Sequence, residues 1–305
     1  MIGMKKWFLV TTVILLLSNS FLTACGSFLV PTPTGTPIPT FTTTQTATLP
    51  PTSTHTPAPT GTPTSIARGL PLSCDADALV PVGEYQVQMD TWGRGTLSGW
   101  SHCISGGTNP DGTMVARWTW NWLNSGGNVK SFPAIVFGKV PSAPTTAGIM
   151  PIRINTISSA SVSYDITSTH TGTGNLILHM WLTNTQDPAT WGVPPITHEV
   201  IICLEVYGEM NPAVPRRMEV DIGKDHYDLY TGDNFGMGWR FIVFQRVPYT
   251  QGPGTLDLVD FLSIAQKEGY ITGSEYLASI SFGNEVVSGT GETIVNSYVV
   301  SVRSK

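Results

Sequence analysis

Apolar and polar residues alternate along most of the chain from residue 71 to the C-terminus. The alternating runs are short and are separated by Gly, Pro, Asn and Asp, a pattern typical of strands joined by turns. They predict strands over residues 84–91, 115–123, 134–139, 161–168, 174–183, 197–207, 226–231, 239–247, 276–283 and 297–303. One segment has helical spacing, with apolar residues at Leu258, Phe261, Leu262 and Ala265, and it is closed by Gly269. The pattern predicts an all-β jelly-roll sandwich of two antiparallel sheets with one short helix.

Two of these strands each place a glutamate opposite an apolar face. In 197–207 the predicted core face is Val200, Ile202, Leu204 and Val206, and the other face is Glu199, Ile201, Cys203 and Glu205. In 276–285 the predicted core face is Ala278, Ile280 and Phe282, and the other is Ser279, Ser281, Gly283 and Glu285. In a bent sandwich the non-core side can form a cleft, so Glu199 and Glu285 are candidates for its chemistry.

The N-terminus has the pattern of an export signal. Lys5 and Lys6 precede an apolar run over residues 7–17, which is short for a membrane span. Residues 22–25, Leu-Thr-Ala-Cys, are similar to the cleavage and lipidation site of bacterial lipoproteins. We therefore expect residues 1–24 to be a lipoprotein signal peptide and Cys25 to carry lipid. The alternative is an ordinary signal peptide with a chance cysteine.

Residues 25–70 are rich in Pro and Thr and are expected to be a disordered tether, because they offer too little apolar surface to offset the entropy of ordering. An extended tether could span on the order of 100 Å. Residues 71–305 would then form the functional domain, held at the extracellular face of a bacterial cell envelope by a lipid anchor in the membrane. We expect this protein to be monomeric.

Composition narrows the function. Charged residues make up 12% of the chain and the net charge is −5, which argues against a nucleic-acid partner.

With Cys25 lipidated, three cysteines remain. Cys74 and Cys103 flank the first predicted hairpin and are expected to form a disulfide, which an exported domain tolerates. Cys203 is expected to be a buried free thiol. No CxxC or His/Cys spacing indicates a metal site, and no cofactor is expected.

Two carboxylates facing each other across a glycosidic bond are the usual groups of glycoside hydrolysis. One stays ionised to attack the anomeric carbon, while the other carries a proton for the leaving oxygen. Tryptophans would line such a cleft, and Trp92, Trp120, Trp122 and Trp181 are available. Because Trp120 and Trp122 alternate with polar residues, they could equally pack in the core.

Several ordered motifs resemble glycoside hydrolase family 12, which comprises retaining endo-β-1,4-glucanases and xyloglucanases with a concanavalin-like jelly roll. The resemblance runs from about residue 72 to 303 and needs no cofactor. It is carried by Ser73-Cys74-Asp75, Tyr85, Asp90-Thr91-Trp92-Gly93, Trp120-Asn121-Trp122, Asn128-Val129-Lys130-Ser131-Phe132-Pro133, Glu199-Val200-Ile201-Ile202-Cys203-Leu204, Tyr276-Leu277, Gly283-Asn284-Glu285 and Ser288-Gly289. It implies that Glu199 is the nucleophile, that Glu285 is the acid/base, and that the opening Cys74 pairs with Cys103. Asp90, Trp92, Trp122, Trp181 and His179 would contact or adjoin the sugar.

The chain departs from the family pattern beside the nucleophile. An Asp that usually hydrogen-bonds the nucleophile is replaced by His179, with Tyr164-Asp165 as a rival match one strand earlier. Ile201 and Cys203 stand where the family has Met and Trp, and Asp90 stands where it has Asn. Three functions therefore stay open. The first is an endo-β-1,4-glucanase acting on cellulose, mixed-linkage β-glucan or xyloglucan. The second is a non-catalytic surface-anchored β-glucan-binding protein, and the third is a hydrolase of another β-glycan such as xylan.

Overall fold

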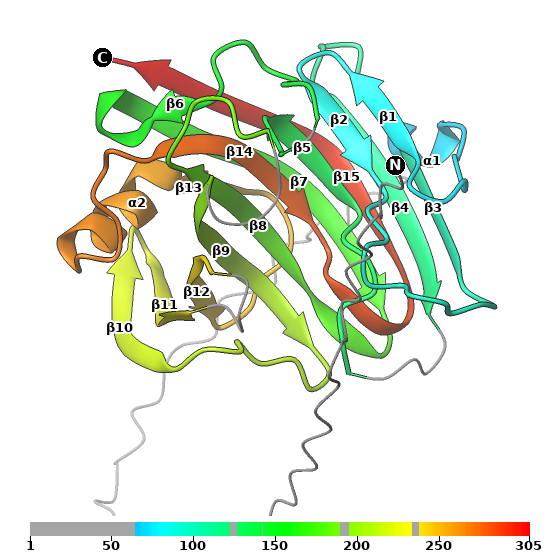
Figure 1. Ribbon diagram of the computed structural model, residues 1–305. Helices are drawn as coiled ribbons and strands as arrows, with labels where there is room; N and C mark the ends of the chain where they lie inside the picture. Colours follow the sequence, from blue (N-terminus) through cyan, green and yellow to red (C-terminus); the bar gives the residue numbers. More distant parts are fainter. Residues whose placement is uncertain (1–64, 123–126, 142, 190–194, 234–237) are drawn as a thin grey trace, which may run out of the picture. The chain divides into compact units, whose positions relative to one another are not determined.

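A computed structural model describes residues 65–122, 127–141, 143–189, 195–233 and 238–305, which belong to one compact unit (Figure 1). The predicted signal peptide, Cys25 and nearly all of the predicted tether lie outside the described residues, as does Leu123 at the end of one predicted strand. None of the helices in the described ranges is long and apolar enough to cross a membrane.

The larger of two sheet layers carries nine strands along one path, with a short tenth strand beside β14. Their order is β1 (Leu79–Val82), β2 (Tyr85–Gln88), β5 (Ala134–Gly138), β14 (Tyr276–Gly283), β8 (Thr173–Thr183), β9 (Ile196–Tyr207), β12 (Arg240–Val247), β11 (Asp225–Asp233) and β10 (Arg216–Ile222). The short strand is β6 (Ile152–Arg153). All of these pairs are antiparallel except β9 with β12, which is parallel. The predicted antiparallel pairing is therefore confirmed except at this one pair.

The second layer consists of β3 (Ser101–Thr108), β4 (Met114–Trp122), β15 (Val286–Ser304), β7 (Ile157–His170) and β13 (Gly254–Asp257). Strand β15 belongs to both layers. Val286 and Ser288 pair with β8 of the larger sheet, whereas the rest of the strand from Gly289 pairs with β4 and β7. The two sheets form the predicted jelly-roll sandwich.

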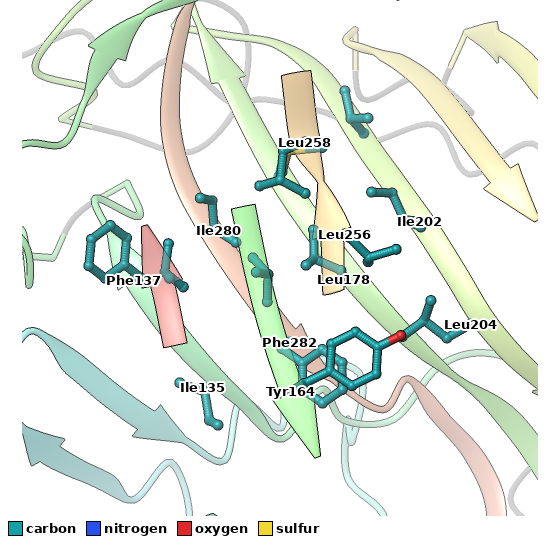
Figure 2. Close-up of a cluster of buried hydrophobic side chains, with 14 of the residues drawn as sticks. Ile135, Phe137, Tyr164, Leu178, Ile202, Leu204, Leu256, Leu258, Ile280 and Phe282 are labelled. Atoms are coloured by element: carbon teal, nitrogen blue, oxygen red, sulfur yellow. The ribbon is translucent and has the colours of Figure 1, made fainter. Parts of the chain in front are cut away.

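The core fills the space between the sheets. Figure 2 shows part of it, with side chains from strands of both layers meeting in one apolar cluster: Ile135, Phe137, Tyr164, Leu178, Ile202, Leu204, Leu256, Leu258, Ile280 and Phe282. Ten of the eleven residues of β8 are buried, since one face packs in this core and the other packs in apolar clusters on the outer face of the sheet. Burial of this apolar area is the main favourable contribution to folding.

Helix α2 (Leu258–Lys267) forms where the helical spacing predicted it. The carboxylate of Asp257 accepts a hydrogen bond of 3.0 Å from Val259 N and so caps the first turn. Leu258, Phe261, Leu262 and Ala265 are buried. Gly269 follows the helix with a φ of 71°, a left-handed conformation that glycine adopts without strain.

Two β-bulges correct the predicted faces. Cys203 pairs with Ile177 but Glu205 pairs with Leu176, so one extra residue lies in β9 and the alternation reverses after it. Val206 therefore packs on the outer face rather than in the core, and Glu205 turns towards β7, with its Oε1 3.2 Å from His170 Nε2.

The second bulge lies between Leu277 and Ser279 of β14. It places Leu277 in the core in place of Ala278, while Ala278 packs against Trp181 and Trp239 on the outer face.

The start of the packed unit differs from the predicted boundary at residue 71. Helix α1 (Ile66–Gly69) lies on β4 and β15, with Ala67 fully buried and Leu70 packed beside it. The last residues assigned to the tether are thus ordered, because these two apolar side chains find a hydrophobic partner in Val115 and Ile294. A single 3₁₀ turn, η1 (Ile154–Thr156), precedes β7.

The structure joins Cys74 to Cys103 in a disulfide and leaves Cys203 as a buried free thiol. The disulfide ties the segment before β1 to β3, next to the backbone bridge between Ser73 and Ile104.

Candidate active site

A cleft of about 890 Å³ lies on the outer face of the larger sheet. Its floor is a second apolar cluster, separate from the core. Ala134 packs within this cluster, and the members that line the cleft are Phe132, Ile177, Ile201, Cys203, Val214 and Val243. Both candidate glutamates line this cleft. Strand alternation places Glu199 there, because it precedes the bulge in β9, whereas Glu285 lies two residues beyond the end of β14.

Two groups hold the carboxylate of Glu199. Trp239 Nε1 donates a hydrogen bond of 2.8 Å to Oε2, and His179 Nε2 lies 3.2 Å from Oε1. Only 9% of Glu199 is exposed. His179 comes from the neighbouring strand β8, where it pairs with Ile201, so the histidine and the glutamate project side by side into the cleft. The Trp239 hydrogen bond fixes one carboxylate oxygen, and the His179 ring lies against the other without hydrogen-bond geometry.

Glu285 is held by Asn175. The amide Nδ2 of Asn175 donates 2.6 Å to Glu285 Oε2, while Oδ1 accepts a 3.0 Å hydrogen bond from Glu285 N. Burial raises the pKa of the Glu285 carboxyl above its ordinary value, and the negative charge of Glu199 raises it further; the Asn175 hydrogen bond and His179 act in the opposite direction. The two carboxyls are therefore close enough to interact, and Glu285 keeps its proton to higher pH than an ordinary glutamate does.

The neighbouring Asn284 connects this carboxylate to the second sheet. Its Oδ1 accepts hydrogen bonds of 2.8 Å from Trp118 Nε1 and from Thr293 Oγ1, and its Nδ2 donates 2.8 Å to the carbonyl of Asn175. Asn284 is fully buried, and its amide is hydrogen-bonded at both ends. A buried, satisfied amide fixes local geometry, so Asn284 fixes the backbone on which both Asn175 and Glu285 stand.

Asp90 also lines the cleft, in an unusual conformation. Its φ is 42°, in the left-handed region that Asn and Asp tolerate better than most residues. Burial raises the pKa of the Asp90 carboxyl to about 6, and the charge of Asp77 adds to this; a backbone hydrogen bond from Trp92 and the proximity of His179 lower it. The Asp90 carbonyl accepts 2.8 Å from Phe132 N, which joins the loop to the cleft floor.

Two of the predicted sugar-contacting tryptophans lie in the cleft. Trp92 stands at its rim with 64% of its surface exposed, and Trp181 lies deeper with 8% exposed. The Trp181 ring meets His179 edge to face at 4.6 Å and Trp239 at 5.4 Å.

The prediction that Trp122 binds substrate is wrong. Trp122 is 1% exposed, stacks on Trp100 at 4.7 Å and donates 3.1 Å to Ser131 Oγ. Trp120 is buried as well. Both lie on the core face of β4, which alternates apolar residues with polar ones and faces the larger sheet. The rival match Asp165 lies on β7, in the other sheet.

Sequence reasoning missed Trp239, Asn175 and Asn284. Asn175 had a usable signal, because it is a polar residue at the start of the apolar strand 174–183 and has the parity of His179. Trp239 gave none, since its distance to Glu199 depends on the parallel pairing of β12 with β9.

Among the described residues, the one group with the spacing of a metal site is Glu219, His226 and Asp228 on β10 and β11. Arg216 contacts both carboxylates of this group, at 2.5 Å from Glu219 and 2.6 Å from Asp228. The guanidinium already offsets their charge, so the group does not fit a cation.

Comparison with known proteins places the chain in one family. Residues 83–303 match the family described as Glycosyl hydrolase family 12. Endoglucanase S of Pectobacterium parmentieri is 28% identical over 240 residues, which cover 76% of this chain and 87% of that protein. A family 12 xyloglucanase from Bacillus licheniformis, solved in complex with ligand, superposes with a TM-score of 0.68 at 28% identity, covering 76% of this chain and 100% of the other. The inactive glycoside hydrolase XLP1 of Phytophthora nicotianae is 25% identical over 253 residues, which cover 78% of this chain and 96% of that protein.

The raised pKa of Asp90 predicts a pH-dependent cost. Ionised Asp90 is disfavoured in the folded protein, so its contribution to stability is present below its ordinary pKa of 3.8 and is lost as the pH rises through about 6. Asp90→Asn keeps the left-handed backbone and removes the charge. Urea unfolding should show the variant about 1–3 kcal/mol more stable than the wild type at pH 8, and equally stable near pH 3.5.

The matched control is Asp233→Asn, because the side chain of Asp233 is 94% exposed. It should not change the difference in stability between the two pH values. A loss of stability for Asp90→Asn at pH 8 would contradict the burial argument.

Proposed function

The chain belongs to glycosyl hydrolase family 12, and we propose that it hydrolyses internal β-1,4-glucosidic bonds of cellulose, mixed-linkage β-glucan or xyloglucan. The observation that carries this proposal is the pair of carboxylates in one apolar-floored cleft, held in different environments. Groups whose surroundings separate their proton affinities divide the roles of nucleophile and acid. The names of the relatives support the same reading, since they include an endoglucanase and a xyloglucanase.

In the proposed mechanism Glu199 is the nucleophile. Its Oε2 is fixed by Trp239 and its Oε1 adjoins His179, so the carboxylate attacks the anomeric carbon from a set direction. The glycosidic C–O bond breaks as the Glu285 carboxyl gives its proton to the departing oxygen. Burial of Glu285 favours the protonated form required for this step.

The second step returns both groups to their starting states. Glu285, now ionised, takes a proton from a water molecule, and the oxygen of that water attacks the anomeric carbon and displaces Glu199. Two inversions leave the sugar with its original configuration. This double displacement requires the carboxyls to be about 5–5.5 Å apart.

A non-catalytic glucan-binding protein is the alternative, and the inactive relative at 25% identity keeps it open for testing. In this chain the alternative is suggested by three residues that differ from the family pattern, His179, Ile201 and Cys203. The presence of both carboxylates in the cleft, each with hydrogen-bond donors, favours the hydrolase.

Replacing each glutamate should separate their roles. With a β-glucan polymer as substrate, Glu285→Gln should lower kcat by about 10²–10⁴-fold because proton donation is lost, and Glu199→Gln should abolish detectable release of reducing ends. With a dinitrophenyl β-cellobioside, which needs no proton to depart, Glu285→Gln should keep its initial burst of dinitrophenol and Glu199→Gln should not.

Glu84→Gln serves as the control, because Glu84 is exposed in the turn between β1 and β2. Should the wild type bind β-glucan yet release no sugar from carboxymethylcellulose, xyloglucan or xylan, the binding-protein alternative replaces the enzyme.

We further propose that His179 positions Glu199. His179→Ala should lower kcat by about 10–100-fold with little change in KM, because a nucleophile displaced by about 1 Å attacks poorly. His179→Gln, which keeps an N–H donor, should recover part of the lost kcat. His170→Gln is a matched control, since His170 makes the same 3.2 Å contact with Glu205 outside the cleft. Equal kcat values for the Ala variant and the wild type would remove His179 from this role.

The remaining part of the proposal concerns location. The basic and apolar N-terminus and the Leu-Thr-Ala-Cys sequence support a lipid anchor at Cys25, with the monomeric domain held on a Pro/Thr-rich tether at the extracellular face of the envelope. The disulfide between Cys74 and Cys103 is compatible with an oxidising compartment.

Fractionation of bacteria that produce the full chain tests the anchor. The wild type should sediment with membranes and should label with a fatty-acid probe, whereas Cys25→Ala should do neither. Cys203→Ser, a change at the buried thiol, should behave as the wild type does. A wild type that sediments with membranes but takes up no fatty-acid label would refute lipidation.

A further inference from the structure

The face of the sheet that lines the cleft extends beyond the two carboxylates, as the register of the paired strands shows. From His179 on β8 the paired positions lead to Ile201 on β9, Val243 on β12 and Tyr230 on β11. The next row leads from Ile177 to Cys203, Gln245 and Asp228. These positions share one face of the sheet. Tyr230, Gln245 and Asp228 therefore extend the cleft floor outward from the residues beside the two glutamates.

This outer part of the face presents polar groups and aromatic rings, whereas the floor of the cleft presents mainly aliphatic side chains. Tyr230 is partly buried against the floor cluster, and Tyr249, at the end of β12, is 39% exposed. The amide Nε2 of Gln245 donates to the Tyr249 hydroxyl and so holds that ring at the edge of the face. Asp228 accepts 2.6 Å from Arg216 on β10.

One atom in this region calls for a ligand. Gln245 lines the cleft, and its Oε1 is buried and has no hydrogen-bond partner within the described part of the chain. A buried acceptor without a donor costs free energy, and a hydroxyl of a bound molecule would supply the donor. The neighbouring tyrosine rings offer apolar faces of the kind on which the C–H faces of a sugar stack.

We propose that Tyr230, Gln245 and Tyr249 form a distal subsite for the main chain of a β-glucan. The proposal rests on the function proposed for the cleft, with which this face is continuous. The subsite lies two strands beyond β9, or about 10 Å, so a chain held at the glutamates must be long enough to cross β12 before it meets Tyr230. A glucan matches the surface because its rings present apolar faces and its rim presents hydroxyl donors.

The test compares chain lengths. Tyr249→Ala and Gln245→Leu should lower kcat/KM for cellohexaose by about 3- to 10-fold, the change expected for the loss of one aromatic or hydrogen-bonded contact. The same variants should cleave cellotriose within about twofold of the wild-type rate. Tyr276→Ala is the matched control, because Tyr276 packs on Arg153 at the far end of β14 and does not line the cleft.

Each outcome decides a separate claim. If the wild type is active and the variants lose nothing on cellohexaose, or lose equally on both substrates, the distal subsite is refuted while the proposed function stands. If the wild type cleaves neither these oligosaccharides nor carboxymethylcellulose, mixed-linkage β-glucan or xyloglucan, the proposed function fails. Calorimetric titration of cellohexaose then decides the subsite. Weaker binding by Tyr249→Ala and Gln245→Leu, but not by Tyr276→Ala, would support it, and unchanged binding by the first two variants or absent binding by the wild type would refute it.

Discussion

The cleft depends on the hydrogen bonds made by the buried side-chain amide of Asn284. Its oxygen is bound by two donors that point into the sandwich, Trp118 and Thr293, and its nitrogen holds the backbone of Asn175 in the larger sheet. A polar group without water must find its partners inside the protein, and here both sheets together supply them. Asn284 therefore contacts both the core and the cleft wall in one fixed geometry. Glu285 is the next residue along the chain, so its backbone position is fixed by Asn284.

Much of the architecture follows from alternation alone. The apolar faces of β8, β9 and β14 are long enough to require a partner sheet, and Glu199 opposes one of them, so its place outside the core could be predicted. The helix could be predicted equally well, because its apolar residues have helical spacing and Gly269 ends it. Glu285 needed more than alternation, since it lies just beyond its strand and its neighbours come from β8.

What could not be predicted depends on contacts between distant residues. Both Glu205 and Val206 fit the alternating pattern of β9, and the bulge that reverses them is favoured by partners for Glu205 on other elements, namely His170 and Gln251. Strand β3 escaped detection because Gly106 and Gly107 weaken its pattern. Those glycines are needed because a Cβ at either position would meet Val87 or Leu70 at about 3 Å or less. Trp122 shows the converse, since a tryptophan suited to a sugar site serves the core when its strand face points inward.

The passage of β15 from one sheet to the other has a mechanical consequence. A single continuous strand pairs with β8 at its start and with β4 and β7 along the rest, so the layers cannot slide or part without breaking its ladders. Such a sandwich behaves as one cooperative body, and its groove cannot open and close around a guest by hinge motion of the layers. A polymer must instead bind from the open side of a preformed cleft. Such a cleft can accept an internal segment of the polymer and does not require one of its ends.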